Sequence, residues 1–153
     1  MNFTVRGLSP QPFVPLYGLS GEELAKRRAR RVVVDGPGFP ERIELRDAEP
    51  GETLLLVNFE HQSADTPYRS AHAIYVREGA TKAWSGDHLP EVMRKRLLSL
   101  RGFSADGMMV DADVVEGREA EPLIERLFAD RQVAYIHAHY ARPGCYAARI
   151  DRA

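Results

Sequence analysis

The alternation of apolar and polar positions predicts β-strands along most of the chain. Stretches rich in β-branched and apolar residues are expected to be strands, namely 2–6, 31–34, 41–45, 53–59, 71–77, 98–103 and 108–115, with two more inside 134–151. Residues 104–107 separate two of these stretches and contain Asp-Gly, a strong hairpin signal. The run Leu54–Val57 lacks alternation, so its strand should be covered on both faces.

Fewer segments have the pattern of a helix. Ser20 followed by Glu23 fits a capping box and predicts a helix over 21–29. Two more helices are expected over 89–97 and 122–130, where apolar residues recur at helical spacing. Because strands follow one another through tight turns, without regular strand–helix alternation, we predict an α+β fold. It should hold a mostly antiparallel sheet of about eight strands and three or four short helices.

Composition and charge narrow the class of protein. With 153 residues, of which 44% are hydrophobic and 28% charged, the chain fits a single domain over 1–153. A net charge of −1 gives no general attraction to nucleic acid or to an anionic membrane, and neither is expected as a partner. A single cysteine and an N-terminus without an apolar signal segment favour a cytoplasmic location.

Two histidines lie two positions apart in the segment 134–151. In an extended strand alternate side chains share a face, so His137 and His139 should point the same way, with Cα atoms about 6.6 Å apart. Such imidazoles can converge on a metal ion or an anionic ligand, or can pack as half-buried, hydrogen-bonded side chains. A metal would need a third ligand from another part of the chain, and the sequence assigns no metal site.

The polar segment Glu60–Ser70 joins two apolar strands with more residues than a hairpin requires. Long ordered loops of this kind often carry function, although a solvated surface loop is the plainer alternative. Its side chains offer an acid, a base, a hydroxyl group and an anion clamp, in Glu60, His61, Asp65, Tyr68 and Arg69.

Cys145 follows the turn-forming pair Pro143-Gly144. With an even loop, Cys145 would pair with Tyr140 or Arg142 on the face away from the two histidines, as an inert buried thiol. A three-residue or bulged loop would instead bring the thiol to the histidine face, where a Cys–His nucleophile pair could form.

Three other residues receive a structural interpretation. His72 shares a face with apolar neighbours and is predicted to be a core histidine. Asp111 and Asp113 share a strand face and are interpreted as a solvent-facing pair rather than a cation site.

A Gly-rich phosphate loop, a Cys-x-x-Cys pair and a Gly-x-Ser-x-Gly motif are all missing from the sequence.

Three stretches of the chain resemble a known family. FEHQSADTPYRSAHAIYVREGA, SLRGFSADGMMVDADVVEG and YIHAHYARPGCYAARIDR are similar to the bacterial family catalogued as domain of unknown function 1203. The resemblance extends nearly end to end and includes the early VRGLSPQPFVPLYGLS. It implies a bacterial source and a single-domain chain, and it implies no activity and no catalytic residue.

The sequence therefore supports two hypotheses. In the first, a binding or catalytic site for an anionic small molecule lies between the Glu60–Ser70 segment and the strand face of His137 and His139. These two and His61 would act as acid or base, and Arg69 and Arg149 would hold the anion. We then expect His137 or His139 to line a pocket with a residue of 60–70. In the second, the chain is a non-catalytic interaction domain that forms a homodimer. No cofactor is assigned.

Overall fold

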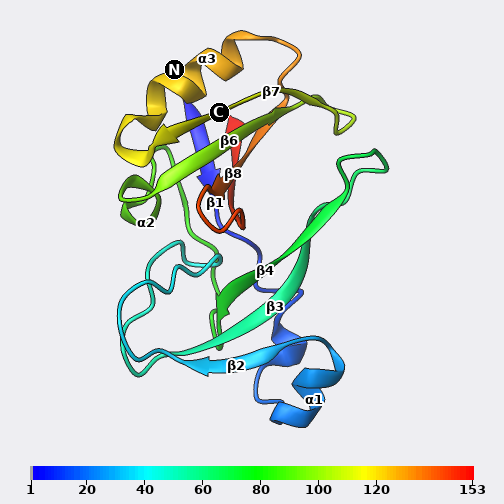
Figure 1. The fold of residues 1–153 in the computed structure, drawn as a ribbon, viewed down its shortest axis with the longest axis vertical. Helices are drawn as coiled ribbons and strands as arrows, with labels where there is room; N and C mark the ends of the chain where they lie inside the picture. The colour runs from blue at the N-terminus through cyan, green and yellow to red at the C-terminus, as the bar shows by residue number, and fades with distance from the viewer. Residues whose placement is uncertain (1) are drawn as a thin grey trace.

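A computed structural model describes residues 2–153 and shows two antiparallel sheets (Figure 1). The six-stranded sheet has the order β5-β1-β9-β8-β6-β7, and the three-stranded sheet has the order β2-β3-β4. The strands are β1 (Phe3–Arg6), β2 (Arg30–Val33), β3 (Thr53–Gln62), β4 (Ser70–Arg77), β5 (Ser85–Gly86), β6 (Leu97–Phe103), β7 (Met109–Glu116), β8 (Tyr135–Tyr140) and β9 (Tyr146–Arg152). The predicted α+β class and mostly antiparallel pairing are confirmed.

The helices are short apart from α3. They are α1 (Gly21–Lys26), α2 (Glu91–Arg94), α3 (Ala120–Ala129) and the 3-10 turns η1 (Val14–Leu16) and η2 (Gly117–Glu119). The Ser20 hydroxyl accepts a hydrogen bond from the Glu23 N–H at 3.1 Å, so the predicted N-cap is present. The helix expected over 89–97 is a single turn, because Leu97 already belongs to β6. No helix within residues 2–153 is long and apolar enough to cross a membrane.

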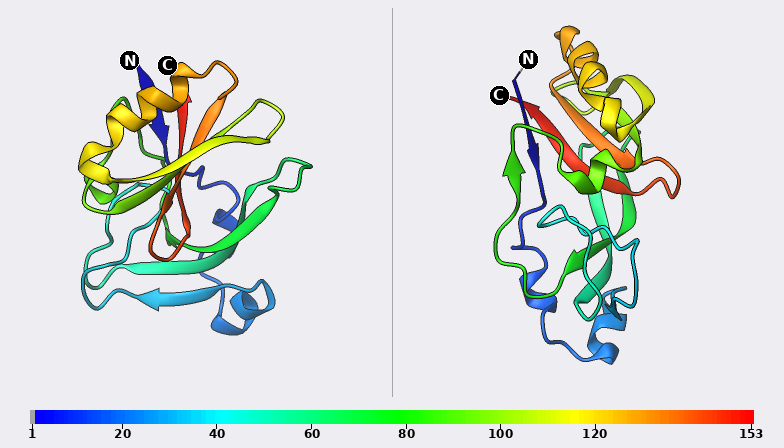
Figure 2. Two further views of the ribbon diagram at one scale, coloured as in Figure 1. Left: turned by 45° about the horizontal axis from the view of Figure 1, so that its top comes forward. Right: turned by 90° about the vertical axis from the view of Figure 1, so that its left-hand side faces the viewer.

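The six-stranded sheet separates two hydrophobic cores. On one face α3 packs on the sheet (Figure 2), and Ile124 and Phe128 are buried with Leu100, Ile136 and Ala138. On the other face lies the end of the three-stranded sheet, where Leu55, Val57, Ile74 and Val76 are buried with Tyr146 of β9. Every residue of β8 is therefore buried, which makes this strand the centre of the molecule.

The prediction of a strand over 41–45 is wrong, and the hydrogen bonds of Glu41 explain why. Its fully buried carboxylate accepts hydrogen bonds from the backbone N–H groups of Ile43, Glu44 and Arg77. These bonds fold the segment into a bend, and Leu45 adopts a positive φ of 50° that no regular strand contains. A side chain has thus taken the place of a neighbouring strand as the hydrogen-bond partner of the backbone.

Three further expectations concern the strands near the site. The run Leu54–Val57 is largely buried, as predicted, with Leu54 and Leu55 fully inaccessible. The Ser104–Gly107 turn is also confirmed, since the Gly107 N–H donates to the Ser104 carbonyl at 3.0 Å. The polar connection is shorter than expected, because β3 extends to Gln62 and β4 begins at Ser70.

The prediction that His72 is a core histidine is wrong. His72 does share a face with Ile74 and Val76, but it lies toward the start of β4 where that face opens to a cavity, and it is only partly buried. Its ring nitrogen Nδ1 is 3.1 Å from the Ala73 carbonyl oxygen.

Candidate metal centre

Three histidines from two sheets meet at one place. His137 and His139 lie on the same face of β8, as the strand period requires, and His61 reaches them from the end of β3. One ring nitrogen from each histidine lies within 4.8 Å of the other two. His61, which the sequence analysis grouped with this pair as a candidate acid or base, therefore supplies the third nitrogen that a metal site needs.

A β-bulge places His61. The register of β3 against β4 shifts between Glu60 and Gln62, so His61 is an extra residue without a regular partner. Consecutive side chains of a strand normally point to opposite faces, but here both His61 and Gln62 reach β8, and the Gln62 amide donates to the Tyr135 hydroxyl at 2.9 Å. A second shift in the pairing of β8 with β9 occurs between Ala138 and His139.

Aromatic rings surround the three imidazoles. The Tyr146 ring stacks on the His61 ring, with centroids 5.2 Å apart and an interplanar angle of 7°. Phe103 and Tyr135 contact the His137 ring, with centroids 5.2 Å and 5.1 Å away. His137 and His139 are consequently 3% and 2% exposed, which is more buried than a site open to a cleft would require.

The hydrogen bonds leave two buried ring nitrogens without a partner among the described residues. Nδ1 of His139 lies 3.0 Å from the Gly144 carbonyl and donates its proton there, so Nε2 carries the lone pair. Nδ1 of His61 and Nδ1 of His137 are both buried, and neither has a hydrogen-bond partner within residues 2–153. Buried polar atoms without a partner are uncommon and need an explanation, such as an ion or ligand that the fold is built to hold.

Two arginines flank His137 across the sheet. In the strand register Arg101 of β6 and Arg149 of β9 both pair with His137 of β8. Arg101 Nη1 also lies 3.5 Å from His139 Nε2, and its Nε donates to the Ser99 hydroxyl. Arg149 also donates to the Asp151 carboxylate at 2.8 Å, which offsets part of its charge, so Arg101 supplies most of the positive charge that favours an anion beside the histidines.

Burial and these charges keep the histidines neutral. Burial lowers the pKa of His61 to about 4, and it lowers the pKa of His137 and that of His139 to about 3. The positive charge of Arg101 lowers all three pKa values further. At neutral pH each ring is a neutral imidazole with one N–H group, so none acts as an imidazolium general acid, and the lone pair of the other ring nitrogen is available to a metal ion.

A cavity of about 440 Å³ opens beside the cluster. We call it the histidine pocket, and it is lined by His61, Gln62, Ser63, Ala64, Ala105, Ala134, Tyr135, His137 and Arg149. His137 thus lines a pocket together with residues of the 60–70 segment, which agrees with one part of the expectation, but both rings of the pair are buried, whereas the expected site required at least one of them to open onto a cleft. The approach of the β6–β7 turn closes one side, where the Thr66 hydroxyl donates to the Gly107 carbonyl at 3.1 Å.

The structure brings together only part of the set expected from the sequence. Arg149 is in the histidine pocket, where its guanidinium lies 4.1 Å from the centre of the Tyr135 ring. Glu60 and Arg69 form an exposed ion pair with each other and do not line it. Asp65 and Tyr68 are exposed and lie outside the pocket lining as well.

The other candidate residues lie outside the histidine pocket and are explained by the packing and ion pairs of the fold. The Tyr140 N–H donates to the Cys145 carbonyl at 2.9 Å, and both residues belong to the core under α3, so Cys145 faces away from the histidines. The even-loop alternative is therefore correct. Asp111 and Asp113 are exposed and both bind Arg126 at 3.1 Å, which agrees with a solvent-facing pair.

Two residues of the site were not identified from the sequence. Arg101 lies beside His137 through the β6–β8 register, and Tyr146 lies under His61 through the packing of β9 on β3. Tyr135 lies two positions before His137, so the alternation of side chains along a strand already predicted that the two rings share a face. No local pattern distinguishes Arg101 from the other arginines of the chain.

Comparison with known proteins identifies the family and nothing more specific. No curated protein and no solved structure matches the chain. The family model described as Protein of unknown function (DUF1203) matches residues 38–152 and leaves 1–37 outside the match. All three histidines, Arg101 and Arg149 lie within the matched range, and the chain belongs to the DUF1203 family.

Proposed function

We propose that the protein binds a divalent transition-metal ion through His61, His137 and His139, and that the ion's open coordination position binds an anionic small molecule in the histidine pocket. The observation that carries the proposal is the set of three ring nitrogens within 4.8 Å of one another. The unpartnered Nδ1 atoms of His61 and His137 support it independently.

The donor set suits zinc and similar ions. Three histidines with one remaining position for water or substrate are a common arrangement in catalytic zinc sites. Around a tetrahedral ion with Zn–N bonds of about 2.1 Å, the nitrogens lie about 3.4 Å apart, so small rotations of the three rings bring them into place. The Gly144 carbonyl accepts the Nδ1 proton of His139 and so fixes its tautomer. A metal-bound imidazole usually has such a hydrogen-bond acceptor at its other ring nitrogen.

Arg101 gives the proposal a specific structural consequence. Its Nη1 occupies space near His139 Nε2 and repels a cation there. Binding of the ion would therefore require the Arg101 side chain to turn away, and the histidine pocket, which Arg101 does not line in this structure, would receive it. There Arg101 and Arg149 would both face an anion held on the metal, which links metal binding to anion binding.

Such a centre has two chemical uses at neutral pH. A bound Zn²⁺ polarises an oxygen ligand, and it lowers the pKa of a bound water to about 7. Arg149 would position a carboxylate or phosphate group next to that oxygen. The aromatic rings of Phe103, Tyr135 and Tyr146 surround the histidines and would keep bulk water away from the ion. Exclusion of water would strengthen the electrostatic interactions between the ion, the anion and the arginines.

Titration of the purified, chelator-treated chain with Co²⁺ tests the proposal. Coordination by three imidazoles should produce the visible absorption of low-coordinate Co²⁺, and Zn²⁺ should displace it. The variants His61→Ala, His137→Ala and His139→Ala should each weaken binding by more than about 100-fold, since even the outer partners of metal-bound histidines contribute about 10- to 100-fold.

His72→Ala and His88→Ala are the matched controls, because neither histidine belongs to the cluster. Both should bind Co²⁺ as the unmodified chain does. Arg101→Met should tighten Co²⁺ binding while weakening the effect of added acetate on the Co²⁺ spectrum. Equal Co²⁺ affinities in the cluster variants and the control variants would refute the proposed metal site.

A further inference from the structure

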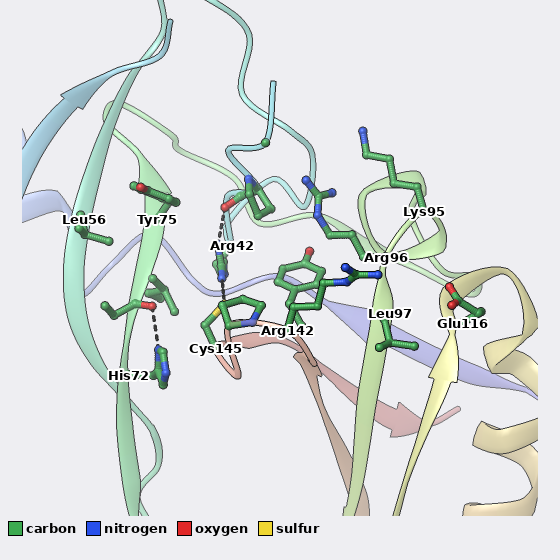
Figure 3. A pocket seen from close by; sticks show the side chains of 16 residues that line it. Arg42, Leu56, His72, Tyr75, Lys95, Arg96, Leu97, Glu116, Arg142 and Cys145 are labelled. Atoms are coloured by element: carbon green, nitrogen blue, oxygen red, sulfur yellow. Dashed lines mark hydrogen bonds between the residues drawn. The ribbon is translucent and has the colours of Figure 1, made fainter. Parts of the chain in front are cut away.

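A second cavity lies at the turn of the β8–β9 hairpin, and Tyr140 and Cys145 line it from the hairpin face that points away from His137 and His139. Its volume is about 530 Å³, within the range of small-molecule sites. We call it the arginine pocket, and its charged side chains are Arg42, Lys95, Arg96, Glu116 and Arg142. Figure 3 shows Arg42, Arg96 and Arg142 gathered between the wall of β3 and β4 and the wall of β6 and β7.

The charges of this pocket do not balance. Four cationic side chains line it, against the single carboxylate of Glu116. Asp47 neutralises part of the excess, since it binds both Lys95 and Arg96. Arg142 is exposed and has no ion-pair partner within residues 2–153.

Arg42 is the most unusual of the four cations. Its side chain is 2% exposed, yet it donates only to neutral acceptors, namely the carbonyls of Pro40 and Tyr146 and the thiol of Cys145. No carboxylate pairs with it among the described residues. A buried charge without a counter-ion is costly, and an anion bound in the adjoining cavity would compensate it.

Tyr140 is a second, independent sign of a ligand. Its ring lies between two guanidiniums, with the Arg42 and Arg96 carbons 5.2 Å and 5.4 Å from the ring centre. Its hydroxyl is buried at the pocket and has no hydrogen-bond partner within residues 2–153. A buried tyrosine hydroxyl usually has a partner, and an oxygen atom of an anionic ligand would supply one.

Apart from His72 and Tyr75, the rest of the lining is largely apolar. Leu56, Ile74, Leu97 and Pro143 form walls that a charged head group alone would not fill. We infer that the arginine pocket binds a small molecule with an anionic head, a carboxylate or a phosphate, and an apolar body. Arg42, Arg96, Arg142 and the Tyr140 hydroxyl would hold the head, and the apolar side chains would contact the body.

This inference does not depend on the metal centre. His139 and Tyr140 are consecutive residues of β8, so their side chains point to opposite faces of the sheet. A ligand in the arginine pocket should bind equally well to the chelator-treated chain and to His61→Ala, which separates the two proposals experimentally.

Isothermal titration calorimetry of the full chain tests the ligand class. The probes are octanoate and octyl phosphate, with octylammonium as the tail of opposite charge and acetate as a head without a tail. At least one of the two anionic amphiphiles should bind about tenfold or more tightly than octylammonium and acetate, and the tighter one identifies the head group. Equal binding of octylammonium, or no binding of either anion, would overturn the inference.

Two variants locate the bound molecule. Tyr140→Phe should weaken binding of the preferred anion by about three- to tenfold, while the urea midpoint of the free protein stays the same or rises because a buried unpaired hydroxyl has been removed. Arg142→Glu should weaken binding by a similar factor. Its matched control is Arg131→Glu, an exposed arginine that does not line the pocket. Equal losses in Arg142→Glu and Arg131→Glu, or unchanged binding in Tyr140→Phe, would contradict this location.

Discussion

The two faces of the β8–β9 hairpin present opposite chemistry within one strand. On one face, His137 and His139 are neutral imidazoles at neutral pH, and each has one unprotonated ring nitrogen. They lie beside a buried His61 nitrogen without a hydrogen-bond partner. On the other face, Tyr140 offers an unpaired hydroxyl between permanent cations. The first face offers lone pairs that would suit an electron-pair acceptor, and the second offers a hydroxyl group and positive charge that would suit an anion. The two-residue period of one strand is therefore sufficient to present two different sets of side chains on its two faces.

Removal of Arg42 should have the largest effect of any single substitution at neutral pH, because Arg42 connects the two faces. It donates to the Tyr146 carbonyl on the histidine side and to the Cys145 thiol on the arginine side. We expect Arg42→Ala to lower the free energy of unfolding by about 3 kcal/mol, since buried acceptors lose a charged donor. Urea denaturation measures the change. Arg142→Ala is the control, and it should remain within about 0.5 kcal/mol of the unmodified chain.

Zinc should stabilise the fold through the histidine face alone. At a free Zn²⁺ concentration of about 100 times Kd, the free energy of unfolding should rise by about 2.7 kcal/mol. His61→Ala should lose this gain and His72→Ala should keep it, as measured by thermal denaturation with and without chelator. A gain of the same size in His61→Ala would mean that Zn²⁺ acts elsewhere.

Acid should destabilise the metal-free chain through the same face. Burial lowers the pKa of His137 and that of His139 from 6.5 to about 3, so between these pH values the unfolded chain binds more protons than the folded one. The stabilising contribution is present above pH 6.5 and is lost as the pH falls toward 3. Each histidine contributes a slope of about 1.4 kcal/mol per pH unit in this window.

Urea denaturation at several pH values measures this slope. His137→Phe, which keeps an aromatic ring without a titrating group, should reduce it. Tyr140→Phe on the arginine face should leave it unchanged. An unchanged slope in His137→Phe would show that another group is responsible.

Replacement of the thiol should have the smallest effect. Cys145 is buried on the arginine face and accepts one hydrogen bond from Arg42. Cys145→Ala is expected to cost about 1 kcal/mol of stability and to leave the Co²⁺ spectrum of the histidine face unchanged. A change in the Co²⁺ spectrum would indicate that the two faces are coupled through the hairpin.

Local sequence patterns predicted most strands because their period and turn residues act within a few positions. The bend at Glu41 was missed for the opposite reason, since one of the backbone groups that Glu41 binds belongs to Arg77, 36 positions away. The α2 segment was predicted too long because apolar positions at 89, 93 and 97 also fit one helical turn followed by the start of a buried strand.

The sequence by itself determined that His137 and His139 share a face and that Cys145 in an even loop faces away, because side chains alternate along a strand. Only the tertiary structure decided that His61 joins them, since a bulge in β3 and the packing of one sheet on the other bring together residues more than 70 positions apart. The arginine pocket likewise collects Arg42, Arg96 and Arg142 from three separate segments. Contacts of this kind depend on how whole elements pack, and no local pattern contains that information.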